Sequence, residues 1–290
     1  MKKILCVVDS YSWALYNRAV ALEKAYPMHK FDIIHFNDLR KRKLKTLKIY
    51  DIVYVLNWPI AGLLFDLKRT RPKDRFVVGA SSHIRYPAKS VLTPFDAVGV
   101  SNKMLYLEYK NRYPKSKIIY TPFGVDCNVF YPQTDPADFH NVFGFVGTSR
   151  RAVKRFSEIK KAIESFGSKV EFITATNRAG YSREQMAEFY NRIGTLICFS
   201  ESEGTPNPVL EAAACGRSVI STPVGNVPEL FRAVPEAHVV TSFFELRRAI
   251  SRSIKSPNKI KRIGEKLAIE AAKNWSWEKQ AKAFGPFLGI

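Results

Sequence analysis

Short apolar runs alternate with amphipathic segments along most of the chain, and this alternation predicts its secondary structure. In the first 123 residues the apolar runs are ILCVV (4–8), DIIHF (32–36), DIVYVLN (51–57), FVVGA (76–80), AVGVS (97–101) and KIIYTPF (117–123). Between the first two lies WALYNRAVALEKA (13–25), which has a helical pattern. Continuous apolar runs of this length are typical of strands in a parallel sheet that helices cover on both faces.

A second series follows residues 133–140, a polar stretch that we interpret as a linker. Its strand-like runs are VFGFVG (142–147), KVEFITAT (169–176), TLICFS (195–200), SVIST (218–222) and HVVTS (238–242). Helices are expected at 160–166, at 182–193, from about residue 207, and in two closing patterns, one of them after WSW (275–277). The sequence therefore predicts an α/β protein of two doubly wound domains, 1–132 and 133–290, with ligands at the carboxyl ends of strands.

The charge of the chain is unusually positive. It carries 46 Lys and Arg against 26 Asp and Glu, a net charge of +20. Residues 1–132 hold 23 basic and 10 acidic residues, a balance of +13, whereas the remainder holds 23 and 16, a balance of +7. Because net charge bears on partners rather than on fold, this excess predicts a polyanionic partner for the N-terminal part.

Several classes of protein do not fit the sequence. The first apolar run meets Asp9 after five residues, and no run reaches the 18 apolar residues of a membrane span. The four cysteines, at positions 6, 127, 198 and 215, are scattered and lack CxxC spacing, which predicts buried thiols rather than disulfides. There is no D-x-D and no His, Cys and Asp cluster with metal-ligand spacing. We expect a cytoplasmic protein without a metal.

The segment from Phe199 to Leu230, FSESEGTPNPVLEAAACGRSVISTPVGNVPEL, contains the most informative chemistry. Two prolines, with Thr205 or Asn207 as N-cap, predict a helix that begins near residue 207 and ends before Gly216. Seven residues separate Glu203, in the loop, from Glu211, on the helix. The free N–H groups and positive dipole end of such a helix favour a phosphate group. The spacing alone also fits an ordinary loop–helix junction with two solvated glutamates.

A cluster of cations follows the first strand of the second domain. In VGTSRRAVKR (146–155), Gly147 ends the strand, and Arg150, Arg151, Lys154 and Arg155 follow within eight residues. Cations at a strand-to-helix turn can neutralise a diphosphate leaving group. The alternative is a solvated basic start of a helix, which is unfavourable because cations oppose the helix dipole there.

Together these segments resemble family 4 of the glycosyltransferases, which have the GT-B architecture of two facing Rossmann-like domains. Glu203 and Glu211 match the family's E-x7-E motif. TPFGVDCNVFYP (121–132) is similar to its interdomain signature NGVDxxxFxP, with Phe123 in place of the usual Asn. Three further blocks resemble the family in the same order: FDAVGVSNKMLYLEYKNRY (95–113), FGFVGTSRRAVKRF (143–156) and NWSWEK (274–279).

The resemblance implies a retaining, metal-independent transfer from a nucleotide-diphosphate sugar, which serves as co-substrate, with no cofactor. It assigns the ribose hydroxyls to Glu211, the transferred sugar to Glu203 and the diphosphate to Lys154, with Arg150 or Arg151 in place of the usual arginine, since Thr148 stands at that position. The other donor-side candidates are Gly147, the backbone N–H groups of Gly204, Thr205 and Asn207, the base-side or core residues Met186 and Tyr190, and His83, beside the reacting centre.

The resemblance also makes residues 1–132 the acceptor domain and predicts that the last helix packs back onto it. Its acceptor-side candidates are Asp9, Tyr11, Asn57 and Trp58, which follow strands. The charge favours hydroxymethylated pyrimidines in DNA as acceptor, by analogy with viral glucosyltransferases of related architecture, and hence a virus-infected host cell. The alternatives are a cell-envelope polysaccharide or an anionic membrane glycolipid, and, more remotely, an inactive nucleic-acid-binding module.

Overall fold

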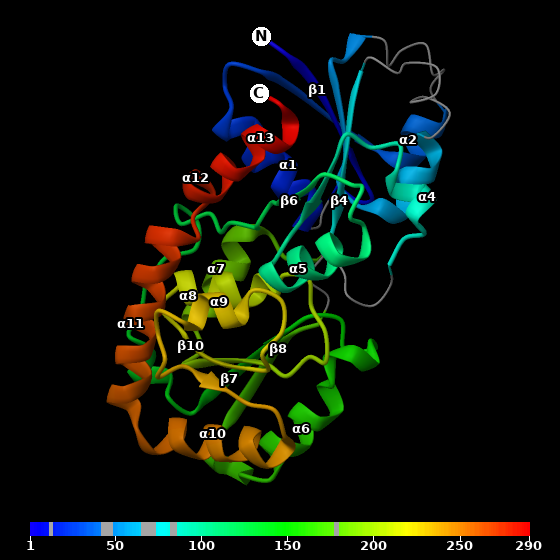
Figure 1. Cartoon of the computed structure of the whole chain (residues 1–290). Coiled ribbons are helices and arrows are strands. Elements are labelled where there is room, and N and C mark those ends of the chain that lie inside the picture. Colours follow the sequence, from blue (N-terminus) through cyan, green and yellow to red (C-terminus); the bar gives the residue numbers. More distant parts are fainter. Residues whose placement is uncertain (12–13, 42–48, 65–73, 82–85, 177–179) are drawn as a thin grey trace. The chain divides into compact units, whose positions relative to one another are not determined.

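The computed structural model describes residues 1–11, 14–41, 49–64, 74–81, 86–176 and 180–290 (Figure 1). The chain forms two compact units. Unit 1 consists of Met1–Gly124 and Trp277–Ile290, and unit 2 of Val125–Ser276. The chain leaves unit 1 after residue 124, whereas the sequence placed the boundary after residue 132. The C-terminal segment, which was expected to return to the N-terminal domain, is part of unit 1.

Unit 1 is built on a parallel sheet of six strands in the order β2-β1-β3-β4-β5-β6. The strands are β1 (Lys3–Val8), β2 (Lys30–His35), β3 (Ile52–Val55), β4 (Arg75–Ala80), β5 (Ala97–Val100) and β6 (Ile118–Tyr120). Each coincides with one of the predicted apolar runs. The chain passes from β1 to β2 on one side and then to β3 on the other. The strand order therefore reverses between β1 and β3, where ligands of such sheets usually bind.

Helices cover both faces of this sheet. They are α1 (Ala14–Ala25), α2 (Phe36–Lys41), η2 (Trp58–Leu64), α4 (Lys89–Leu92), α5 (Lys103–Arg112), α12 (Trp277–Gln280), η7 (Ala281–Ala283) and α13 (Phe284–Leu288). The C-terminal helices lie beside α1 (Figure 1), where Tyr26 donates a hydrogen bond of 2.5 Å to the carbonyl of Ala281. The ring of Phe287 packs edge-on against Tyr54, with centroids 5.1 Å apart.

A buried arginine explains the unusual Phe123 of the interdomain signature. The side chain of Arg18 is 1% exposed, and its guanidinium lies 3.5 Å from the centroid of the Phe123 ring. It also donates a 3.0 Å hydrogen bond to the hydroxyl of Tyr54. Stacking on an aromatic ring stabilises a buried guanidinium, so an aromatic residue suits this position.

Unit 2 contains a parallel sheet of five strands in the order β11-β10-β9-β7-β8. The strands are β7 (Val142–Val146), β8 (Glu171–Ala175), β9 (Thr195–Cys198), β10 (Ser218–Ser221) and β11 (His238–Val239). Here too the chain first adds a strand on one side of β7 and then places β9 on the other. The strand order reverses between β7 and β9, so their carboxyl ends frame the expected ligand crevice.

The helices of unit 2 are η3 (Pro136–Phe139), η4 (Ala152–Lys154), α6 (Phe156–Glu164), η5 (Gly167–Lys169), α7 (Arg183–Asn191), α8 (Asn207–Ala214), α9 (Val227–Phe231), α10 (Phe243–Lys255) and α11 (Pro257–Asn274). The single closing pattern expected before WSW is in fact two helices, α10 and α11. They separate at Ser256, whose φ of −139° and ψ of 66° are not helical. Pro257 disfavours the helical conformation at the preceding residue, which accounts for the break.

The polar stretch 133–140 is not a linker but part of unit 2. The backbone N–H of Gln133 donates to the side chain of Asn191 (2.8 Å), and Thr134 donates to the carbonyl of the same residue (2.5 Å). The buried Arg217 donates to the carbonyl of Thr134 at 2.6 Å. Gln133 and Thr134 are exposed, but these hydrogen bonds attach the stretch to the body of unit 2.

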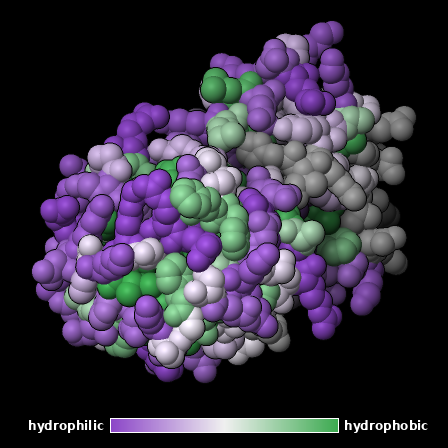
Figure 2. All heavy atoms as spheres, turned by 90° about the horizontal axis from the view of Figure 1, so that it is seen from below, coloured by the Kyte–Doolittle hydropathy of each residue, from purple (hydrophilic) through white to green (hydrophobic). Residues whose placement is uncertain are grey.

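The predicted state of the cysteines agrees with the structure. Cys6, Cys198 and Cys215 are buried thiols outside any disulfide, whereas Cys127, also outside any disulfide, is only half-buried. No helix among the described residues is long and apolar enough to cross a membrane. On the face seen in Figure 2, hydrophobic residues form separate small groups among hydrophilic ones.

Candidate functional site

A partly buried ion pair bridges the two strand ends at the reversal point of unit 2. Lys154, from η4 after β7, places its Nζ 2.6 Å from Oε1 of Glu203, in the loop after β9. The two side chains are only 14% and 13% exposed. Gly147, at the end of β7, has a φ of +147°, which residues with a side chain rarely adopt, while a Cβ there would make only ordinary contacts with Lys154. The two residues that sequence analysis assigned to the diphosphate and the sugar are therefore in direct contact.

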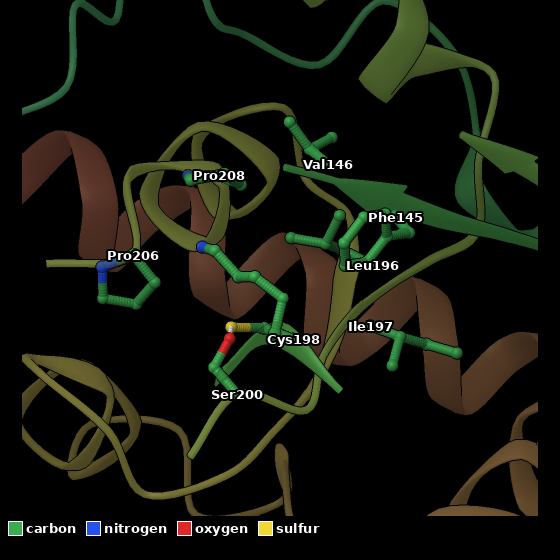
Figure 3. Close-up of a pocket in the computed structure, with 9 residues that line it drawn as sticks. Phe145, Val146, Leu196, Ile197, Cys198, Ser200, Pro206 and Pro208 are labelled. Carbon is green, nitrogen blue, oxygen red and sulfur yellow. Dashed lines mark hydrogen bonds between the residues drawn. The ribbon is translucent and has the colours of Figure 1, made fainter. Parts of the chain in front are cut away.

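A small cavity lies between these strand ends and the start of α8 (Figure 3). In Figure 3 the side chains of Cys198 and Ser200 lie close together, and Pro206 and Pro208 come from the start of the helix. The cavity is lined by Phe145, Val146, Lys154, Leu196, Ile197, Cys198, Ser200, Pro206 and Pro208. Its walls are mostly apolar, so the amino group of Lys154 acts in surroundings that screen charge weakly.

The helix of the E-x7-E segment begins and ends as predicted. It spans Asn207–Ala214, and Gly216 follows with a φ of +71°. The expectation of Thr205 or Asn207 as a side-chain N-cap is wrong, because Pro206 holds the N-cap position and no side chain caps the helix. Oγ1 of Thr205 and Oδ1 of Asn207 are instead buried without a hydrogen-bond partner among the described residues. The start of α8 therefore has two buried polar oxygens that could accept hydrogen bonds from a ligand.

The second glutamate is held by a residue of α7. Glu211 is 8% exposed, and its Oε2 accepts a 2.7 Å hydrogen bond from the hydroxyl of Tyr190. Tyr190 and Met186 are themselves buried, at 0% and 1% exposure. These two residues therefore pack in the core of unit 2, and Tyr190 orients Glu211 through its hydroxyl.

The four cations after β7 divide into two groups. Arg155 binds Glu158 with two hydrogen bonds of 2.6 and 2.5 Å, and its guanidinium lies 3.9 Å from the centroid of the Phe199 ring. The bond from Arg155 lowers the pKa of the Glu158 carboxyl. Arg150 and Arg151 are exposed. Arg150 and Arg151 can therefore bind an anion, whereas the guanidinium of Arg155 is bound to Glu158 and packs on Phe199.

The acceptor-side candidates lie at the corresponding reversal point of unit 1. Asp9 and Tyr11 follow β1, and Asn57 and Trp58 follow β3. The hydroxyl of Tyr11 accepts a 2.9 Å hydrogen bond from the backbone N–H of His35, while the residue as a whole remains 49% exposed. Trp58 is partly buried and packs against the core. His83 lies outside the described residues.

Two residues at these strand ends were not found by sequence analysis. His35 ends β2, and its Nε2 lies 2.8 Å from the carbonyl of Asp9, so it ties the β1 and β2 loops together. Asn226 is fully buried, and neither atom of its amide has a partner among the described residues. It follows Gly225, whose φ is +58° and where a Cβ would lie 2.8 Å from the carbonyl oxygen of Gly204. The turn residues PVGN after the strand were the available signal for this loop.

The described residues contain no group of three or more His, Cys, Asp or Glu that could hold a metal ion. Partial burial raises the pKa of the Asp9 carboxyl, and the nearby His35 partly offsets this shift. The expectation of a metal-independent site stays a prediction.

The comparisons with known proteins concern the same region. Residues 130–255 match the protein family described as Glycosyl transferases group 1. The chain is 26% identical to a probable sucrose-phosphate synthase of Thermosipho melanesiensis over 212 residues, which cover 61% of this chain and 49% of that protein. It thus matches about half the length of that curated relative.

Two solved structures share the fold over nearly the full chain. The sucrose-phosphate synthase of Thermosynechococcus elongatus has a TM-score of 0.77 at 16% identity, covering 99% of this chain and 98% of that one. HepE of Anabaena, in complex with UDP and glucose, has a TM-score of 0.76 at 13% identity and covers 100% of both chains. These likenesses confirm the predicted fold class, the GT-B fold with its two Rossmann-like α/β domains.

Proposed function

We propose that the protein transfers a sugar from a nucleotide-diphosphate sugar to an acceptor hydroxyl, with the donor bound in unit 2. The observation that carries this proposal is the Lys154–Glu203 pair at the reversal point of the sheet, 2.6 Å apart and largely buried. A half-buried cation next to a helix N-terminus suits a diphosphate, and a neighbouring carboxylate suits sugar hydroxyls.

Each part of a nucleotide sugar has a matching group in unit 2. The ammonium of Lys154 and the N-terminus of α8 would bind the diphosphate, with Arg150 or Arg151 as a second cation. Glu203 would accept hydrogen bonds from the transferred sugar, together with the backbone N–H groups of Gly204, Thr205 and Asn207. Glu211, fixed by Tyr190, would accept hydrogen bonds from the ribose.

The proposed reaction retains the anomeric configuration and needs no metal. Negative charge grows on the leaving diphosphate in the transition state, and Lys154 would stabilise it as a metal ion does elsewhere. Because no carboxylate among the described residues is a clear nucleophile, we expect departure and attack on the same face of the sugar. The leaving diphosphate would then help to deprotonate the acceptor.

The comparisons support UDP-glucose as the first donor to test. HepE, which shares the fold, was solved with UDP-glucose as well as with UDP and glucose. The match of residues 130–255 to a glycosyltransferase family covers Lys154, Glu203 and Glu211. The presence of all three residues argues against an inactive binding module.

The acceptor is a separate proposal, and charge favours a polyanion. The balance of +13 in residues 1–132 supports DNA as one candidate and an anionic glycolipid or envelope polysaccharide as the other. Nine of the 23 basic residues in that part fall in segments 42–48, 65–73 and 82–85, outside the described residues. The candidates therefore have to be separated by experiment.

The test is a donor and acceptor panel. The protein is incubated with UDP-, ADP- and GDP-sugars, with hydroxymethylated DNA, oligosaccharides or anionic glycolipid vesicles, and with or without EDTA. We expect release of the nucleoside diphosphate, product of retained configuration by NMR, and full activity in EDTA. Loss of activity in Glu203→Gln, with retained folding by circular dichroism, would connect the reaction to this site. Absence of binding to every nucleotide sugar would refute the proposal.

A further inference from the structure

The carboxylate of Glu203 is held through a single oxygen by two different donors. Its Oε1 accepts 2.6 Å from Nζ of Lys154 and 2.8 Å from Oγ of Ser200. In the proposed function, Lys154 must also serve the diphosphate, which is a stronger anion than a carboxylate. A lysine shared between two anions cannot by itself fix the position of the glutamate.

We infer that Ser200 is a positioning residue, which keeps Glu203 directed at the transferred sugar while Lys154 engages the diphosphate. This inference rests on the proposed function. A hydroxyl is suited to this task because it is uncharged: the diphosphate attracts Lys154 electrostatically but exerts no comparable pull on Ser200. The hydrogen bond from Ser200 therefore persists when the donor binds.

Ser200 is itself fixed by the neighbouring strand end. Ser200 is 2% exposed, and its carbonyl oxygen accepts a 2.6 Å hydrogen bond from Oγ1 of Thr222, which follows β10. The backbone N–H of Thr222 also donates to the carbonyl of Cys198 at 3.0 Å. Hydrogen bonds from Thr222 thus connect the loop after β10 to the loop after β9, which carries Ser200 and Glu203.

The loop after β10 also packs closely against the backbone of Glu203 and Gly204. Gly225, three residues after Thr222, approaches so closely that a Cβ there would lie 2.8 Å from the carbonyl oxygen of Gly204 and 3.2 Å from that of Glu203. Its φ of +58° is also one that other residues rarely adopt. Residues 222–225 therefore contact both Ser200 and the loop that carries Glu203.

The chain offers a matched control for Ser200. Ser218, at the opposite end of β10, is also buried, at 0% exposure, but its Oγ has no partner among the described residues. Ser200→Ala and Ser218→Ala each remove the hydroxyl of a buried serine, but only Ser200→Ala removes a hydrogen bond to Glu203. A difference between them reports the hydrogen bond rather than the loss of a buried oxygen.

The experiment measures UDP and UDP-glucose binding by calorimetry, and kcat and KM for transfer or hydrolysis of UDP-glucose. For Ser200→Ala we expect UDP affinity within about twofold of wild type and kcat lowered roughly 10- to 100-fold, the range for a hydrogen bond to a charged group. Ser218→Ala should match wild type in all values. Thr222→Val should lower kcat less than Ser200→Ala, and Thr222→Ser should restore it.

The outcomes separate the two proposals. If the wild type turns over UDP-glucose and both serine variants keep the same kcat, the inference about Ser200 is wrong while the donor site stands. If Ser200→Ala weakens UDP as much as UDP-glucose, its role is structural and the inference is also wrong. If the wild type binds neither UDP nor UDP-glucose, the donor-site proposal falls and this inference falls with it.

Discussion

The hydroxyl of Tyr190 donates a 2.7 Å hydrogen bond to Oε2 of Glu211, and both side chains are buried in unit 2. The glutamate therefore has a fixed orientation before any ligand arrives. If Glu211 accepts hydrogen bonds from both ribose hydroxyls, its substitution should weaken the binding of UDP, which has the ribose but lacks the transferred sugar.

We therefore predict that Glu211→Ala weakens UDP binding by about 1.5–3 kcal/mol, or roughly 10- to 150-fold, the scale of hydrogen bonds to a charged group. Tyr190→Phe, which keeps the ring, should weaken it by a smaller factor because the carboxylate loses only its orientation. Calorimetry with UDP measures both, and Met186→Leu serves as a control for repacking on α7. Unchanged affinity in a folded Glu211→Ala protein would remove the ribose assignment.

Lys154→Ala should affect turnover more than donor binding. Charge on the diphosphate increases in the transition state, so a cation there contributes more to catalysis than to ground-state affinity. We expect kcat to fall by about 10²- to 10³-fold, the range for loss of one such stabilising group. Steady-state kinetics with UDP-glucose measure this effect. A rise in KM at constant kcat would mean that the lysine only captures the donor.

Much of this arrangement was readable from the sequence because local rules decide it. Buried parallel strands have continuous apolar runs, and the prolines and Gly216 set the limits of α8. Strand order was not readable, and it is the order of β7 and β9 that brings Lys154 to Glu203, 49 residues later. Side-chain pairing across such a distance depends on packing of the whole unit.

Two further missed residues, Ser200 and Thr222, lack a local signal of their own. Ser200 and Thr222 are ordinary small polar residues at strand ends, and their role appears only when β9 and β10 are placed side by side. Similarly, the polar stretch 133–140 has the composition of a linker but is bonded to Asn191 and Arg217, which lie far along the chain. Composition indicates exposure on average and cannot identify specific partners.

The salt dependence of acceptor binding should distinguish DNA from the other acceptors. If the N-terminal part contacts about five phosphates, affinity for duplex DNA should fall roughly 10²- to 10³-fold between 50 and 200 mM salt, through counterion release. Unmodified duplex should compete, because phosphate contacts carry no sequence information. Gel-shift titrations measure this, beside flotation with anionic vesicles. Tight vesicle binding with no DNA binding at 50 mM salt would contradict DNA as acceptor.

A partly buried histidine should make unit 2 sensitive to acid. Burial, followed by the charges of Lys259 and Arg252, lowers the pKa of His238 to about 4. An unfolded histidine titrates near 6.5, so between these values the unfolded chain binds the extra proton. The free energy of unfolding should thus fall as pH drops from about 6.5 towards 4, by at most about 3 kcal/mol from this residue.

His238→Gln tests this contribution because glutamine does not titrate. Urea denaturation at pH 7.5 and pH 4.5 gives the loss of stability for wild type and variant, and the loss should be about 2–3 kcal/mol smaller in the variant if the shift is fully expressed. Carboxylates elsewhere contribute equally to both proteins and cancel in the comparison. An identical pH dependence in the two proteins would show that His238 is not held neutral by the fold.

The last prediction concerns Tyr11, whose ring is exposed but whose hydroxyl is fixed by the backbone of His35. A rigid exposed aromatic ring at the reversal point of a parallel sheet is suited to stacking on a ligand, because little conformational freedom is lost on binding. Tyr11→Ala should therefore raise the KM for the acceptor by about 5- to 30-fold, the effect of losing about 1–2 kcal/mol of contact.

Donor binding provides the internal control for this prediction. In the proposed function UDP binds in unit 2, so UDP affinity should be the same in Tyr11→Ala and wild type. Met28, which is 77% exposed in unit 1, provides a second control, because Met28→Ala should change neither the acceptor KM nor UDP affinity. Tyr11→Phe keeps the ring but loses the bond from His35, so it should fall between wild type and Tyr11→Ala. Initial rates at varied acceptor and saturating UDP-glucose give the KM values. An acceptor KM that Tyr11→Ala leaves unchanged would remove Tyr11 from the proposed acceptor site.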